Sequence, residues 1–146
     1  MSNAIMATKI TFKKAEAEWC NYHNTLKEIA KLREEIMNPF VDEPDDAGVV
    51  QGANSVRIPG DPTGRMATRL TTSRQLSYLT EIVEAIEQVY EALPESHKKL
   101  ARLRYWNTNN KLTWDIIAGE IHVSRRQAIY WRDEIIQATM EVLGWR

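Results

Sequence analysis

The sequence predicts an all-α protein: a long N-terminal helix, a flexible Pro/Gly linker and a C-terminal helical domain that contains a helix-turn-helix. Apolar residues recur at spacings of three and four in several segments, as on one face of an α-helix. No segment shows the alternation of a β-strand. Four of the five prolines fall within residues 38–64, which marks a break between helical parts. We therefore expect a tag-like or disordered start over 1–10, a helix over 11–37, a linker over 38–70 and a helical domain over 71–146.

The N-terminal helix carries a long apolar stripe. Its spacing is close to the 3.5-residue repeat of a coiled coil, and Pro39 stops it. The stripe either docks on its own domain or forms a homodimer, and the sequence leaves both open. Its members are Phe12, Ala15, Trp19, Tyr22, Leu26, Ile29 and Ile36.

Capping residues place the C-terminal helices. One helix is expected from Thr71 or Thr72 to Leu93, ended by Pro94, and the next begins at Glu95-Ser96. Thr113 can cap a short helix over 114–121. Ser124 and Gln127 form a capping box for a last helix, which ends at Gly144.

Residues 113–142 fit a helix-turn-helix. Ala118 is the small residue where the first helix meets the second, and the Val123 side chain in the turn packs between the two helices. His122 stands at the turn position where Gly is commonest, but His is among the side chains enriched at positive φ. The tryptophans of this region, among them Trp131, are expected to fill the core of a small helical domain.

Composition excludes several classes of protein. The chain has 146 residues, of which 43% are hydrophobic and 27% charged, as in soluble globular proteins. No apolar run approaches the ~18 residues of a membrane span. The lone Cys20 fits a reducing cytosol, and with His23 it is too sparse for a zinc site, so we expect a cytoplasmic protein without metal or cofactor. No nucleophile motif or carboxylate pair suggests an enzyme.

Charge points to the last third of the chain. The formal net charge is −1, yet residues 94–146 hold nine Lys/Arg against six Asp/Glu. Arg and Gln at the start of a recognition helix can bond guanine and adenine edges in the major groove. We therefore expect double-stranded DNA as partner. The base-reading candidates are Arg125, Arg126, Gln127, Ile129 and Tyr130. The phosphate-contact candidates are Lys98, Lys99, Arg102, Arg104, Lys111, Thr113 and Arg132.

Much of the chain resembles a known family. Arg104-Tyr105-Trp106, Leu112-Thr113-Trp114, the run from Ile121 to Ala128 and Leu143-Gly144-Trp145 are similar to the RinA/ArpU-like phage transcriptional regulators. Gly52 to Val56 and Asp61-Pro62-Thr63 resemble that family's linker. The C-terminal part also resembles region 4 of sigma-70-type factors. The resemblance implies an activator of late phage genes, with DNA reading at Arg125, Arg126, Gln127 and Tyr130.

Two other functions stay open on the sequence alone. A small terminase-like packaging protein would share the helix-turn-helix but assemble as a ring, and such proteins usually carry the DNA-binding part at the N-terminus. A sigma-like module would use the last helices to contact RNA polymerase.

Overall fold

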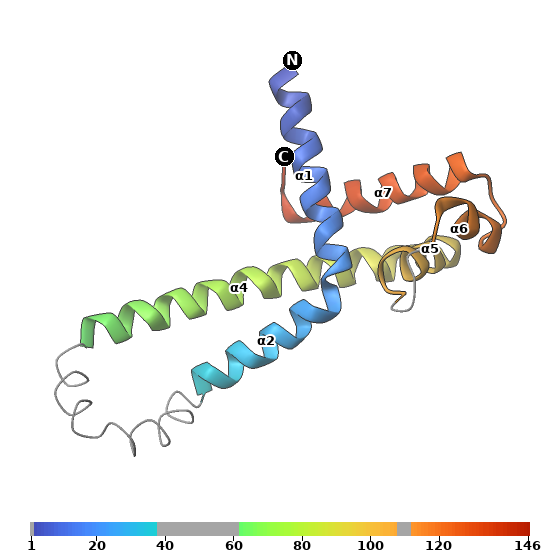
Figure 1. Cartoon of the computed structure of the whole chain (residues 1–146). Helices are drawn as coiled ribbons and strands as arrows, with labels where there is room; N and C mark the ends of the chain where they lie inside the picture. Colours follow the sequence, from blue (N-terminus) through green and yellow to red (C-terminus); the bar gives the residue numbers. More distant parts are fainter. Residues whose placement is uncertain (1, 38–61, 108–111) are drawn as a thin grey trace. The chain divides into compact units, whose positions relative to one another are not determined.

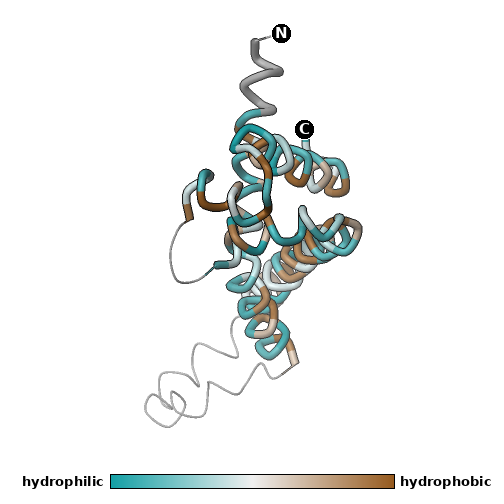
Figure 2. Tube along the Cα trace, turned by 90° about the vertical axis from the view of Figure 1, so that its right-hand side faces the viewer, coloured by the Kyte–Doolittle hydropathy of each residue, from teal (hydrophilic) through white to brown (hydrophobic). Residues whose placement is uncertain are grey.

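The computed structural model describes residues 2–37, 62–107 and 112–146. These residues form six α-helices and no strand, so the all-α prediction is confirmed (Figure 1). The helices are α1 (Ser2–Cys20), α2 (Tyr22–Met37), α4 (Pro62–Ala92), α5 (Glu95–Tyr105), α6 (Trp114–Glu120) and α7 (Arg125–Leu143). Figure 2 shows hydrophobic and hydrophilic residues interspersed along the coloured parts of the helices, as expected where one face of a helix is apolar and the other polar.

The residues fall into two compact units. One contains Met1–His23 and Glu81–Arg146, and the other contains Asn24–Thr80. We call the first the core unit and the second the arm unit. The predicted N-terminal helix is thus divided: it breaks at Asn21, and its two halves, α1 and α2, belong mainly to different units.

The core unit has one hydrophobic core. Ala15 and Trp19 of α1 are fully buried in it, together with residues of α4, α5, α6 and α7. Figure 1 shows α1 crossing α7, and the two helices are in contact. The first half of the predicted helix therefore docks on the C-terminal helices. The fully buried large side chains of this core are Trp19, Ile82, Ile86, Leu100, Ile117, Ile135 and Ile136.

The arm unit buries few side chains. In α2 only Thr25, Ile29 and Leu32 are buried. These positions are three or four residues apart and so lie on one helical face. Apolar residues on other faces are exposed, among them Leu26 and, on α4, Leu70.

Two predicted boundaries were wrong. Residues 2–10 are helical where we expected a disordered start, and α4 begins at Pro62, well before Thr71. Proline is tolerated at the first helical position because its missing N–H has no partner there, and a single glycine such as Gly64 costs a helix only about 1 kcal/mol. Three threonine hydroxyls of α4 donate to the carbonyl four residues earlier. The rest of the predicted linker, 38–61, lies outside the described residues.

The capping and stop residues predict the other helix ends correctly. The Thr113 hydroxyl accepts from the Ile116 N–H, and the Ser124 hydroxyl accepts from the Gln127 N–H at 3.0 Å. Pro94 follows α4, and Gly144, at φ 73°, follows α7. Each of these signals is local, which explains why the sequence alone predicts them.

Candidate DNA-binding site

Helices α6 and α7 are joined by the short segment 121–124. Three side chains that close the angle between them are buried: Ile117 and Ala118 on α6 and Ala128 on α7. Val123 packs against the same core. The residues chosen from the sequence for this inner face therefore lie there.

The turn is a Schellman motif with histidine in the glycine position. His122 has φ 60°, and its N–H donates to the Gly119 carbonyl, while the Val123 N–H donates to the Ala118 carbonyl at 3.0 Å. These two bonds satisfy carbonyls that the end of a helix leaves open. His122 is the only non-glycine residue with positive φ among the described residues, as its place in the sequence predicted.

The first turn of α7 presents cations to solvent. Arg125 and Arg126 are exposed, Tyr130 is 59% exposed, and Gln127 and Ile129 are half-buried. The helix N-terminus adds unpaired backbone N–H groups and a positive dipole end, which favour phosphate oxygens. All five base-reading candidates thus lie on the first two turns of one helix.

Asp115 modifies this surface. Its carboxylate lies 3.7 Å from the Nε of Arg125, and the two side chains are 81% and 61% exposed. An ion pair this exposed is weak and screened by salt. Sequence reasoning did not single out Asp115, because the contact needs the turn between α6 and α7.

The predicted phosphate-contact residues divide into two groups. Lys99 and Arg102 are exposed although each makes a hydrogen bond, Lys99 to the Glu120 carbonyl and Arg102 to the Tyr90 hydroxyl. The Lys98 side chain is only 19% exposed and lies near Glu95. Thr113 caps α6. The Arg104 guanidinium lies 4.6 Å from the centre of the Trp114 ring. Lys111 lies outside the described residues.

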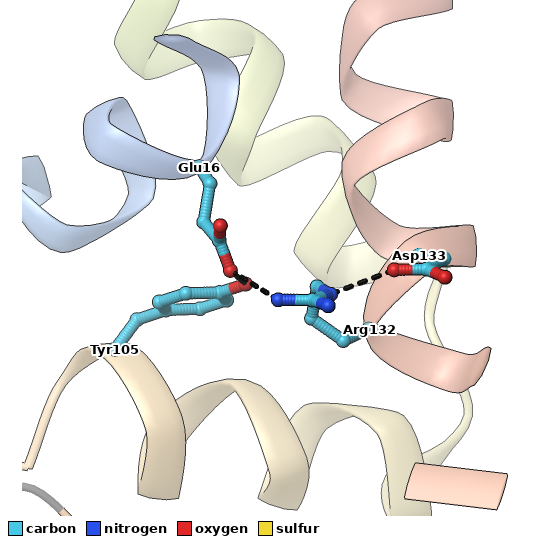
Figure 3. A network of polar contacts seen from close by, with 4 residues as sticks. All are labelled: Glu16, Tyr105, Arg132 and Asp133. Carbon is cyan, nitrogen blue, oxygen red and sulfur yellow. Dashed lines mark hydrogen bonds and ion pairs between the residues drawn. The ribbon is translucent and has the colours of Figure 1, made fainter. Parts of the chain in front are cut away.

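Arg132 belongs to the interior instead. Its guanidinium donates to Glu16 and to Asp133, each at 2.7 Å, and its side chain is 18% exposed (Figure 3). The Tyr105 hydroxyl donates to the same oxygen of Glu16. Burial alone would lower the pKa of Arg132, but these hydrogen bonds and the Glu16 charge outweigh it and raise the pKa. Two nitrogens of Arg132 are thus engaged within the protein: Nη1 binds Glu16 of α1, and Nε binds Asp133 of α7 itself. Phosphate contact by Arg132 stays a prediction that these bonds disfavour.

The tryptophans pack as expected, with one difference of degree. Trp106, Trp114, Trp131 and Trp145 are only partly buried at the edge of the core, and the fully buried tryptophan is Trp19. Trp131 stacks on His97 with ring centres 4.4 Å apart. Among the described residues, no group of three or more His, Cys, Asp or Glu is placed to hold a metal ion.

The sequence pattern of a family described as "Protein of unknown function (DUF722)" matches residues 20–141. The chain belongs to this family. The DUF722 chain is also 28% identical, over 134 residues, to a protein named "Transcriptional activator rinA" from Staphylococcus phage phi11; the match covers 92% of this chain and 91% of that protein. The resemblance to RinA-like regulators is thus confirmed. No solved structure matches the DUF722 chain. In the part of the chain that the structure describes, no helix is both long and apolar enough to span a membrane.

Proposed function

We propose that this protein is a phage-type transcriptional regulator that binds double-stranded DNA through α6 and α7. One observation carries the proposal: the first turn of α7 is exposed and cationic, while the opposite face of the same two helices is buried in the core. A helix that presents Arg125, Arg126 and Tyr130 at its N-terminus suits the major groove. The similarity to a phage protein named "Transcriptional activator rinA" supports a role in activating transcription. Late phage genes are the proposed targets, as the resemblance to RinA/ArpU-like regulators implies.

Within this proposal the contacts have different roles. Arg125 and Arg126 read guanine edges or bind phosphate, and Gln127 reads adenine. Ile129 touches a thymine methyl group, and Tyr130 bonds a phosphate oxygen. Lys98, Lys99, Arg102 and Arg104 of α5, with Thr113 and Lys111, supply further phosphate contacts. One helix-turn-helix offers a small contact area, so tight binding to DNA needs a second anchor. In this proposal RNA polymerase can supply that anchor.

The test is DNA binding by the full-length protein. Segments of its own phage or host genome are titrated at several salt concentrations, against random competitor DNA, with wild type and Arg125→Ala/Arg126→Ala. Each lost phosphate contact should reduce the slope of log K against log salt by about 0.9. The matched control is Lys27→Ala/Lys31→Ala, which removes two exposed positive charges from α2.

Selective binding that is lost in the Arg125/Arg126 variant and kept in the control supports the proposal. Binding that the two arginines do not affect overturns the assignment to α7. Binding without any sequence preference, by a protein that assembles as a ring, favours a packaging role.

A further inference from the structure

The core unit contains a pocket whose lining residues lie outside α6 and α7: Tyr22, Glu87, Tyr90, Glu91 and Trp106. Its volume is about 360 Å³. Three of these residues are aromatic and two are carboxylates. None is among the residues to which we assign DNA contact.

Contacts with Trp19 and with one another hold the aromatic rings in place. The Trp106 indole N–H donates to the Trp19 carbonyl at 3.0 Å, and its ring stacks on the Trp19 ring. The rings of Tyr22 and Tyr90 have centres 5.1 and 5.0 Å from the centre of Trp106. The three rings thus form a rigid cluster whose members are only partly buried. Aromatic faces carry negative charge density and attract cations.

The carboxylates add net negative charge to the same pocket. Glu87 and Glu91 lie four residues apart, on one face of α4. Glu87 accepts a hydrogen bond from the Tyr22 hydroxyl at 2.5 Å. Burial, that hydrogen bond and the Glu87 charge raise the pKa of Tyr22 to about 12, so the hydroxyl stays a donor at neutral pH. Neither glutamate has an ion-pair partner among the residues that the structure describes.

The helix end reinforces this charge. α4 ends at Ala92, one residue after Glu91, and its last turn contains no basic residue. The negative end of the helix dipole therefore lies beside two carboxylates without a cation to compensate them. Two cations of α5 contact Tyr90 and not the carboxylates: Arg102 donates to the Tyr90 hydroxyl at 2.6 Å, and the Lys98 amine lies 5.5 Å from the centre of the Tyr90 ring.

We propose that this pocket binds the guanidinium group of an arginine side chain of a protein partner. A guanidinium is planar, so it can stack on a ring such as Trp106 or Tyr22 while its N–H groups reach a carboxylate. An alkylammonium group satisfies the charge but not the flat shape. None of the lining residues lies on α7, although Arg102 and Lys98, which we propose as phosphate contacts, touch Tyr90 at the edge of the pocket.

The test follows the Trp106 indole N–H signal by NMR in the full-length protein. The probe is N-acetyl-arginine amide, and N-acetyl-citrulline amide is its neutral counterpart of nearly the same shape. We expect saturable shifts of Trp106 with the arginine probe only. Glu87→Gln/Glu91→Gln should weaken that binding about fivefold or more, since both carboxylates contribute to a charge-assisted contact. Glu81→Gln/Glu84→Gln removes the same charge from exposed positions of α4 outside the pocket and should leave binding unchanged.

Spermidine forms the third arm of the experiment. Tighter binding of spermidine than of the arginine probe overturns the assignment to a protein side chain and makes the pocket a polyamine site. Equal response to arginine and citrulline, or no saturable response to either, overturns the cation site altogether. Trp106→Phe keeps a ring in place but removes the indole signal, so the backbone amide signals of Tyr22 and Tyr90 report binding in this variant. Loss of arginine binding with intact folding supports stacking on the indole, and unchanged arginine binding overturns that stacking.

Discussion

The indole Nε1–H of Trp19 donates a hydrogen bond to the hydroxyl of Thr139 at 2.9 Å, and both side chains are fully buried. Thr139 in turn donates to the Ile135 carbonyl. The two residues are 120 positions apart in the chain and join α1 to α7. Helix α1 therefore packs in the same core as α7, the candidate DNA-reading helix.

Replacing Thr139 by Val should destabilise the protein by about 1–3 kcal/mol. Valine has nearly the same shape but no acceptor, so the Trp19 N–H is left buried without a partner. Urea unfolding measures the change. The control is Thr71→Val, whose hydroxyl also donates to the carbonyl four residues earlier but is exposed. Equal effects of the two substitutions would mean that the Trp19 bond contributes nothing.

The packing of α1 against α7 could not be predicted from the sequence. The spacing of Ala15 and Trp19 correctly gave a helix with an apolar stripe, but the same stripe suits a dimer arm or a docked helix. Burial against Ile135 and its neighbours decides between them, and burial is a tertiary property. The turn at His122 and the cap at Ser124 were predictable, because those signals act within a few residues.

Tyr22 and Tyr105 should make stability fall at alkaline pH. Burial, and then the nearby Glu16 charge and hydrogen bond, raise the pKa of Tyr105; burial and Glu87 raise that of Tyr22 to about 12. An unfolded tyrosine has a pKa of about 10. The folded protein thus holds protons that the unfolded chain releases, so this stability is fully present below pH ~10 and is lost as pH rises above it.

The measurement is the free energy of unfolding at pH 8 to 11. Tyr22→Phe/Tyr105→Phe should flatten the alkaline loss, whereas Tyr130→Phe, at an exposed tyrosine, should follow wild type. The comparison with Tyr130→Phe removes the contribution of lysines, which titrate in the same range. A wild-type slope in the double variant would contradict the assignment.

His122 should be replaceable by glycine with a gain in stability. At φ 60° a residue with a Cβ is strained, and glycine removes this strain, so we expect His122→Gly to stabilise by about 0.5–1 kcal/mol. His122→Val should destabilise by about 1–3 kcal/mol, since a β-branched side chain fits this region worst. Thermal unfolding measures both changes.

The control is Gln137→Gly, inside α7, which should destabilise the protein by about 1 kcal/mol because glycine is unfavourable within a helix. A loss of stability in His122→Gly would disprove strain at the turn.

Asp115 should weaken DNA binding in the wild-type protein. Its carboxylate competes with DNA for Arg125 and repels phosphates. Because an exposed ion pair contributes about 0.2–1 kcal/mol, Asp115→Asn should raise affinity by roughly 1.4- to 5-fold at low salt and less at high salt. Fluorescence anisotropy with labelled duplex DNA measures this. Glu35→Gln removes one exposed negative charge from α2 and serves as the control. An increase no larger than the control would indicate that Arg125 does not contact DNA.

The arm unit should form a homodimer. The predicted dimer helix over 11–37 is reduced to α2, because Ala15 and Trp19 of α1 are used inside the core unit. Apolar side chains of the arm unit remain exposed, including Met66 at 64% and Leu70 at 61%, one turn apart on α4.

We expect Met66→Lys/Leu70→Lys to convert a dimer to a monomer in light scattering after size-exclusion chromatography. Operator affinity should then fall about 100-fold, since two linked DNA-binding units gain greatly from binding together. Ser73→Lys/Gln75→Lys adds the same charge at exposed polar positions of α4 and should stay dimeric. A wild-type protein that is monomeric at every concentration would rule out this dimer, and RNA polymerase would then be the remaining candidate for a second anchor on DNA.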